Sequence, residues 1–109
     1  MSETALERLA ATIKARRGDS ASKSYTRQLL DAGTETCAKK FGEEAVEAVI
    51  AAVSQDADAL KGEAADVLYH LLVLLEARGV ALSEVLTVLD KRSGTSGLEE
   101  KAGRSKGAE

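Results

Sequence analysis

The feature that most constrains this sequence is a pair of long segments with helical periodicity, separated by the short turn Gln55-Asp56-Ala57-Asp58. The first segment runs from about Glu35 to Val53, and the second ends at about Arg78, where Gly79 provides a stop signal. Because so short a connection makes consecutive helices antiparallel neighbours, the two segments predict a helical hairpin.

Apolar side chains indicate which surfaces of this hairpin are buried. The second segment contains the most apolar run of the chain, residues 67–75, and a helix that is apolar on all sides is typically buried. Gly42 interrupts the first segment at some energetic cost. The apolar stripe of the first segment consists of Cys37, Phe41, Ala45, Ala48 and Ala52, widened by Val46, Val49, Ile50 and Val53.

Three shorter helices are predicted around the hairpin. The first is amphipathic and ends in the loop at residues 17–20. The second covers residues 24–30 and is stopped by Gly33, after which Thr34 is the expected cap of the first long helix. The third follows the hairpin, with Ser83 as its cap. The apolar positions of the first and third are Leu6, Leu9, Ala10 and Ile13, and Leu82, Val85, Leu86 and Leu89.

The composition predicts the all-α class. Proline is absent, and strong helix formers dominate. Apolar residues make up 44% of the 109 residues but aromatic residues only 3%, so Ala, Leu and Val must build the core. We expect a helical bundle of four to five helices in one domain over residues 1–92, with a mobile tail over residues 93–109. Since so small a domain buries a reduced fraction of its surface, we expect homodimerisation to complete the bundle.

Several classes of protein are disfavoured by charge and sequence. The net charge of −3 and pI near 5.3 argue against a nucleic-acid partner. We expect no membrane partner, because the N-terminal residues lack a signal peptide's pattern and no apolar run approaches the roughly 20 residues that span a bilayer. The single cysteine, Cys37, permits no intrachain disulfide, which suits a cytoplasmic protein.

Two acidic clusters stand on the two long helices. The first contains Glu43 and the pair Glu44-x-x-Glu47, and the second is Glu63-x-x-Asp66. Side chains three positions apart lie on the same face of a helix, so facing antiparallel helices would bring the two pairs together. Four such carboxylates repel one another unless a cation neutralises them, and oxygen ligands of this kind suit magnesium or manganese.

The competing interpretation of these acidic residues is a solvated helix surface. That interpretation is adequate for Glu43, Glu44 and Glu47, because exposed helix faces are rich in glutamate. Asp66 is harder to explain in this way, because it leads directly into the apolar run, and burying an uncompensated carboxylate is energetically costly. We therefore favour a metal site.

Longer stretches of the sequence resemble a known family over nearly the whole chain up to about Arg92. The matching stretches are Ser24-Tyr25-Thr26, residues 39–47, residues 63–75, Ala77-Arg78-Gly79-Val80 and Leu82-x-x-Val85-Leu86. They resemble the phosphoribosyl-ATP pyrophosphohydrolases. The broader resemblance is to the all-α, MazG-like nucleoside triphosphate pyrophosphohydrolases, which carry the two acidic motifs on adjacent helices.

The resemblance implies a reaction and a site. Phosphoribosyl-ATP would be hydrolysed between its α and β phosphates to phosphoribosyl-AMP and pyrophosphate, the second step of histidine biosynthesis. Glu43 would orient a ligand or assist the attacking water. The residues implied as magnesium ligands are Glu44, Glu47, Glu63 and Asp66.

Cationic and polar side chains are expected to bind the rest of the substrate. The chain has no Walker loop, so Lys39 and Lys40 are the first candidates for phosphate contacts, although Lys40 also has the spacing for an ion pair with Glu44. The matching segment offers Lys23, Ser24 and Tyr25 for the 5′-phosphate or ribose, with Arg16 and Arg92 as further anion contacts.

Two further residues and two further functions remain to be weighed. His70 either orients Asp66 or is a core histidine, and Cys37 has no predicted catalytic role. A second enzymatic hypothesis is a housecleaning pyrophosphohydrolase that acts on another nucleoside triphosphate. A third hypothesis is a helical assembly module without activity, which would not depend on Asp66 or bind magnesium tightly.

Overall fold

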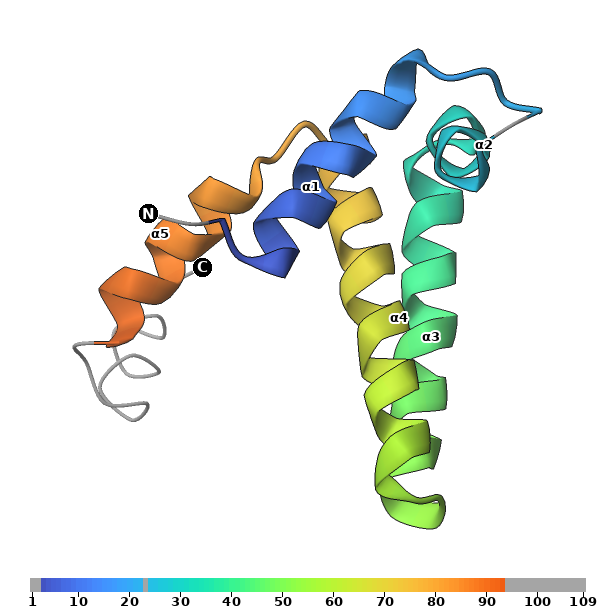
Figure 1. Ribbon diagram of the computed structural model, residues 1–109, viewed down its shortest axis with the longest axis vertical. Coiled ribbons are helices and arrows are strands. Elements are labelled where there is room, and N and C mark those ends of the chain that lie inside the picture. The colour runs from blue at the N-terminus through green and yellow to red at the C-terminus, as the bar shows by residue number, and fades with distance from the viewer. Residues whose placement is uncertain (1–2, 23, 94–109) are drawn as a thin grey trace, which may run out of the picture.

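The computed structural model describes residues 3–22 and 24–93, and every regular element in these ranges is helical. The all-α class is therefore confirmed, with five α-helices and one 3₁₀ turn in the described ranges (Figure 1). Lys23 and residues 94–109, which include nearly all of the predicted tail, lie outside them. The elements are α1 (Ala5–Ala15), η1 (Arg16–Gly18), α2 (Tyr25–Ala32), α3 (Thr34–Ser54), α4 (Ala57–Ala77) and α5 (Leu82–Ser93).

The predicted hairpin is formed by α3 and α4, which lie side by side and antiparallel (Figure 1). Each helix has 21 residues, or a length of about 31 Å at 1.5 Å per residue. Only Gln55 and Asp56 separate them. The side chain of Asp56 caps α4, because its Oδ1 accepts a hydrogen bond from the backbone N–H of Ala59 at 2.8 Å.

The junction before α3 differs from the prediction that Thr34 would be its cap. Thr34 is already the first helical residue, and Gly33 is the residue that both ends α2 and precedes α3. Gly33 has φ of 99°, a conformation that glycine adopts without a steric penalty. The chain thus changes direction within one residue and leaves no position for a threonine cap.

The end of α4 follows the predicted glycine signal. Gly79 has φ of 72°, and its N–H donates to the carbonyl of Glu76 at 3.1 Å. The next N–H, that of Val80, donates back to the carbonyl of Leu75 at 2.9 Å. These two bonds satisfy carbonyls that the helix end would otherwise leave unpaired.

The hydrophobic core lies at one end of the hairpin, where α1 and α2 pack against α3 and α4 (Figure 1). Val73, from the apolar run, is only 1% exposed. The run is nevertheless not buried on all sides, because Leu68 is 44% exposed. The buried cluster consists of Ile13, Leu29, Cys37, Leu72 and Val73.

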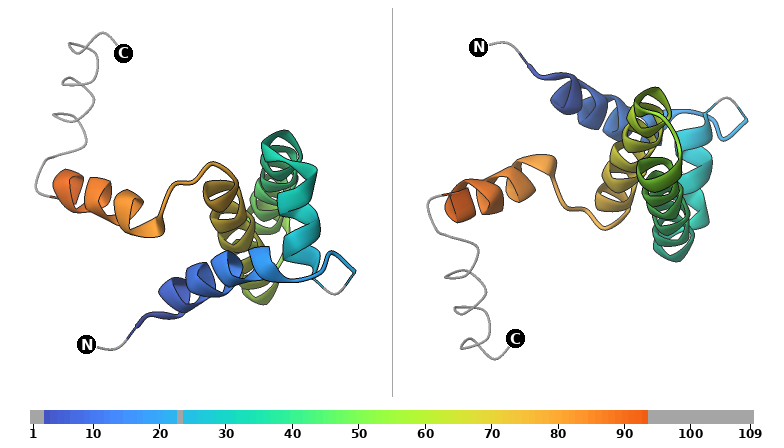
Figure 2. Two further views of the ribbon diagram at one scale, coloured as in Figure 1. Left: turned by 90° about the horizontal axis from the view of Figure 1, so that it is seen from above. Right: turned by 90° about the horizontal axis from the view of Figure 1, so that it is seen from below.

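The other half of the hairpin and most of α5 are left uncovered by the described chain. Val49 is 62% exposed and Val53 is 81% exposed, so the apolar stripe predicted for α3 is buried only in part. From α5, Leu82 packs against the core, while the helix itself leads away from the hairpin (Figures 1 and 2). None of the described helices combines the length and apolar character required to cross a bilayer.

Candidate metal centre and substrate contacts

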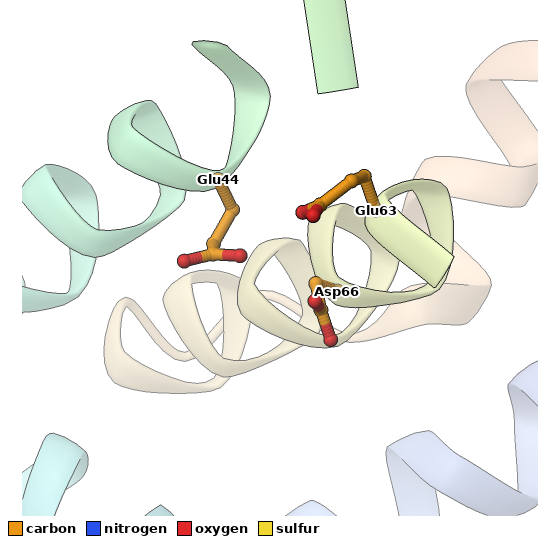
Figure 3. Close-up of side chains that lie close together, drawn as sticks. All are labelled: Glu44, Glu63 and Asp66. Carbon is orange, nitrogen blue, oxygen red and sulfur yellow. The ribbon is translucent and has the colours of Figure 1, made fainter. Parts of the chain in front are cut away.

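The hairpin brings together three of the carboxylates predicted to bind a metal. Glu44 projects from α3, while Glu63 and Asp66 project from α4 (Figure 3). One carboxylate oxygen of each residue lies within 4.8 Å of the others. The antiparallel pairing of α3 with α4 therefore places this part of the two acidic clusters as the sequence predicted.

Glu63 is the carboxylate under the greatest electrostatic constraint. It is half-buried, and its Oε1 is buried without a hydrogen-bond partner among the described residues. Burial raises the pKa of the Glu63 carboxyl, and the nearby negative charges of Glu47, Asp66 and Glu44 raise it further. The buried oxygen and the converging charges are conditions that a bound cation would relieve.

Asp66 is exposed, so the argument that it is a buried carboxylate at the start of the apolar run was wrong. Residues three apart in a helix differ by about 60° around its axis. This offset lets Glu63 point between the helices while Asp66 lies at the edge of the same group (Figure 3). The buried carboxylate exists, but it belongs to Glu63.

Glu47 and Glu43 are not members of this group of three carboxylates. Glu47 is outside the three-oxygen cluster, although its charge acts on Glu63. Glu43 is exposed and forms an ion pair with Lys40, with 3.6 Å between Nζ and Oε1. The alternative predicted for Lys40 was an ion pair with Glu44, and the structure places Glu43 there instead. Lys39 is exposed on the same helix.

The segment before α2 supplies a buried cap and a half-exposed ring. Ser24 is buried, and its Oγ accepts a hydrogen bond from the backbone N–H of Arg27 at 3.1 Å. It therefore begins α2, and its hydroxyl hydrogen remains for another acceptor. Tyr25 is 51% exposed. Lys23, the third candidate from this segment, lies outside the described residues.

Tyr25 belongs to an aromatic cluster with Tyr69 and His70 of α4. The two tyrosine rings stack with 6.5 Å between centroids and 17° between planes. His70 packs edge-on against Tyr69 at 5.0 Å and against Tyr25 at 6.3 Å. His70 is buried, as expected for a core histidine, and its Nδ1 has no hydrogen-bond partner among the described residues.

Tyr69 is a potential site residue that the sequence analysis did not single out. Its hydroxyl and that of Thr26 are 2.5 Å apart and form a hydrogen bond between α4 and α2. The available signal was its position three residues after Asp66, on the same face of the helix. Its place within the apolar run suggested a residue of the hydrophobic core instead.

The remaining candidates have other partners. Arg16 forms an ion pair with Asp19 at 3.0 Å. Cys37 is buried and its Sγ donates to the carbonyl of Leu29 at 3.2 Å. Burial raises the pKa of the Cys37 thiol, which agrees with the absence of a predicted nucleophilic role. Arg92 lies near the end of α5, within the described range.

The acidic group lies apart from two hollows in the structure. Two hollows, of about 370 Å³ and 300 Å³, are found elsewhere, and Glu44, Glu63 and Asp66 line neither of them. The larger hollow lies between α1 and the end of α4 and includes Lys14 and Glu76. The metal-centre hypothesis therefore depends on the carboxylates themselves and not on an enclosing cavity.

Comparison with known proteins supports the resemblance seen in the sequence. The family model described as phosphoribosyl-ATP pyrophosphohydrolase matches residues 6–93. A phosphoribosyl-ATP pyrophosphatase of Cereibacter sphaeroides strain KD131 is 62% identical over 101 residues, which cover 93% of this chain and 98% of that protein. The corresponding protein of Rhodobacter capsulatus is 61% identical over 101 residues, with the same coverage.

A more distant relative extends the match along the chain. The phosphoribosyl-ATP pyrophosphatase 1 of Rhodopseudomonas palustris is 57% identical over 106 residues, which cover 97% of this chain and 99% of that protein. Such coverage leaves little of either protein unmatched. The family inferred from the acidic motifs and their flanking residues is thereby confirmed, and the chain belongs to the phosphoribosyl-ATP pyrophosphohydrolase family.

Proposed function

We propose that Glu44, Glu63 and Asp66 bind a magnesium ion at which this enzyme carries out the reaction of its family. That reaction is hydrolysis of phosphoribosyl-ATP to phosphoribosyl-AMP and pyrophosphate, a step of histidine biosynthesis. The observation that carries the proposal is the buried Oε1 of Glu63, which lacks a hydrogen-bond partner among the described residues and is surrounded by like charges.

The chemistry of the donors fits magnesium. Each member of the group offers a carboxylate oxygen, and hard oxygen ligands suit magnesium, with manganese as an alternative. When bound, the ion supplies positive charge against the triphosphate and the departing pyrophosphate. We include Glu47 as a fourth ligand, because its negative charge acts on Glu63.

The surrounding side chains are assigned to three further roles: orientation of the water, neutralisation of the phosphates and contact with the nucleoside. We propose that Glu43 orients the attacking water or a ligand of the metal. Lys39 and Lys40 lie on α3, close in sequence before the acidic motif, and are proposed to neutralise phosphate oxygens. The N-terminal turn of α2, with Ser24 and Tyr25, would contact the nucleoside part of the substrate, and Lys23 is proposed to assist there.

The test is to incubate the purified protein with phosphoribosyl-ATP and magnesium and to identify the products by mass spectrometry. We expect phosphoribosyl-AMP and pyrophosphate, with loss of turnover in EDTA and in Glu44→Gln and Asp66→Asn. Glu35→Gln is a matched control, because Glu35 is an exposed glutamate in the first turn of the same helix as Glu44. Full activity of Asp66→Asn, or of the wild type in EDTA, would overturn the proposed metal centre.

Substrate specificity is tested by offering other nucleoside triphosphates to the same preparation. Efficient turnover of these would favour the housecleaning hypothesis while keeping the metal centre. Absence of turnover with every triphosphate, together with no magnesium binding, would favour the assembly-module hypothesis. We expect phosphoribosyl-ATP to be strongly preferred.

The uncovered half of the hairpin leads us to propose a homodimer. Two hairpins packed together form a four-helix bundle, and a contiguous apolar surface of this kind often marks an interface. A second copy would cover the valines that the chain itself leaves exposed. The exposed apolar residues on α3 and α4 are Val46, Val49, Ile50, Val53, Leu60 and Leu68.

We further propose a cytoplasmic enzyme without a nucleic-acid partner. Cys37 is a free, buried thiol, a state that a reducing compartment maintains. The net charge of −3 disfavours contact with a polyanion. Both proposals suit a protein whose substrate is a small, highly charged metabolite.

A further inference from the structure

The chain contains few aromatic residues, yet most of them meet at one place. It has two tyrosines, one phenylalanine and no tryptophan. Both tyrosines and the single histidine pack together where the first turn of α2 meets α4. Tyr69 lies at the edge of the core, but Tyr25 as a residue remains 51% exposed, so its ring is not enclosed by the core. The hydrophobic core does not explain why that ring is where it is.

The ring of Tyr25 is held in place by its neighbours. It stacks nearly parallel to Tyr69, which is itself fixed by the hydrogen bond to Thr26. His70 contacts both rings edge-on, at interplanar angles of 84°. A ring that is already oriented loses little conformational freedom when a ligand packs on it, and this favours binding.

We infer that the ring of Tyr25 is a stacking platform for the purine base of the nucleotide substrate. The inference rests on the proposed function, because it takes the phosphates to lie at the carboxylate centre. Every base has a flat π-face, and stacking on an exposed tyrosine contributes substantially to nucleotide affinity. Tyr25 is thus a binding residue that contacts the base, with Tyr69 and His70 positioning its ring.

The platform lies within reach of a nucleotide bound at the carboxylates. Tyr69 and His70 follow Asp66 by three and four positions, so they share its face of α4 about one turn, or 5.4 Å, farther along the axis. In a nucleotide, one ribose separates the α-phosphate from the base. In the opposite direction α4 leads toward Leu60 and the hairpin turn, where the sequence has no aromatic residue.

The openness of the cluster suits this particular base. Phosphoribosyl-ATP carries a phosphoribosyl group in addition to its triphosphate, so an open ring face accommodates it more readily than a closed pocket would.

The first test compares Tyr25→Leu, which removes the ring, with Tyr25→Phe, which keeps it. We expect Tyr25→Leu to raise KM for phosphoribosyl-ATP by about five-fold to a hundred-fold with little change in kcat, the pattern of a lost binding contact. Tyr25→Phe should retain most of the affinity. Equal losses in the two variants would assign the effect to the hydroxyl and overturn the stacking role.

A second measurement separates the base from the phosphates. AMP contains a purine base, whereas pyrophosphate does not, and both can be measured as inhibitors. Tyr25→Leu should weaken inhibition by AMP and leave inhibition by pyrophosphate close to that of the wild type. If both inhibitors weaken equally, the substitution has disturbed the site as a whole, and the inference fails.

Binding can also be followed without turnover, which separates this inference from the proposed reaction. The chain has no tryptophan, so its two tyrosines dominate the intrinsic fluorescence, and AMP stacking on Tyr25 should quench it. We expect quenching in the wild type and in Asp66→Asn, and its loss in Tyr25→Leu. Quenching by AMP in a protein that hydrolyses no triphosphate would refute the function but keep the platform. Turnover that does not depend on the Tyr25 ring would support the proposed function and refute the stacking platform.

Discussion

The two ends of the α3–α4 hairpin differ sharply in how they are covered. At the end that holds Cys37 and Val73, α1 and α2 close over the helices and both side chains are 1% exposed. Toward the turn, the same two helices leave Val49 and Val53 exposed. The carboxylates lie between these regions in both helices. The site therefore forms where the chain's own core ends, with buried residues on one side and an exposed apolar surface on the other.

The largest effect on stability is expected at the covered end. Ile13→Ala removes a side chain that is 1% exposed and should lower the free energy of unfolding by about 2–5 kcal/mol. Val49→Ala, at the open end, should cost less than about 0.5 kcal/mol in dilute protein, as exposed substitutions usually do. Chemical denaturation of the two variants checks the difference. Equal losses would mean that the open end is already covered in dilute solution.

The largest effect on activity is expected between the two ends, at Glu63. Glu63→Gln should reduce kcat/KM by at least about 100-fold, because even residues that only support metal ligands cost 10-fold to 100-fold. The same change removes one of several converging negative charges, so the metal-free variant should melt at a higher temperature than the metal-free wild type. Thermal melting in EDTA measures this effect, and a lower melting temperature would show that the Glu63 carboxylate stabilises the metal-free fold, which contradicts the expected repulsion.

The sequence predicted the elements of the fold better than it predicted exposure. Gly33 and Gly79 mark helix ends because the chain there needs positive φ, a local property that residue type reveals. The pairing of Glu44 with Glu63 and Asp66 followed from helix periodicity and a short turn. These inferences needed no knowledge of how the other helices pack.

Exposure could not be predicted in the same way, because it depends on which neighbours cover each face. Asp66 and Glu63 differ by less than one helical turn, yet Asp66 is exposed and the Oε1 of Glu63 is buried. Val49 has the periodicity of a core residue, but no described helix covers it. Tyr69 belongs to an apolar run and still forms a polar contact with Thr26, which only the placement of α2 creates.

An intermediate effect, on the dissociation constant of the proposed dimer, is expected when a charge is introduced at the open end of the hairpin. Ile50→Glu introduces a carboxylate onto the apolar surface proposed to join two copies, and should raise the dimer dissociation constant by at least about tenfold. Thr36→Glu is the matched control, since Thr36 is an exposed polar residue of the same helix. Sedimentation velocity across a range of concentrations measures both variants. An unaltered dimer in Ile50→Glu, or a monomeric wild type, would exclude this surface as the interface.

The smallest effect on stability is expected at Lys40, beside the carboxylates. Its ion pair with Glu43 is exposed and spans three positions on one helix, so Lys40→Met should change the free energy of unfolding by only about 0.3–0.5 kcal/mol.

The kinetic effect of Lys40→Met distinguishes two possible roles of Lys40, contact with the phosphates and an ion pair with Glu43. If Lys40 contacts the phosphates, Lys40→Met should raise KM for phosphoribosyl-ATP. Glu43→Gln breaks the same ion pair but keeps the lysine charge, so it should leave KM near the wild-type value while lowering kcat if Glu43 orients the water. Identical changes in the two variants would mean that Lys40 acts only through Glu43, and that the phosphates are held by Lys39 or by residues beyond α3.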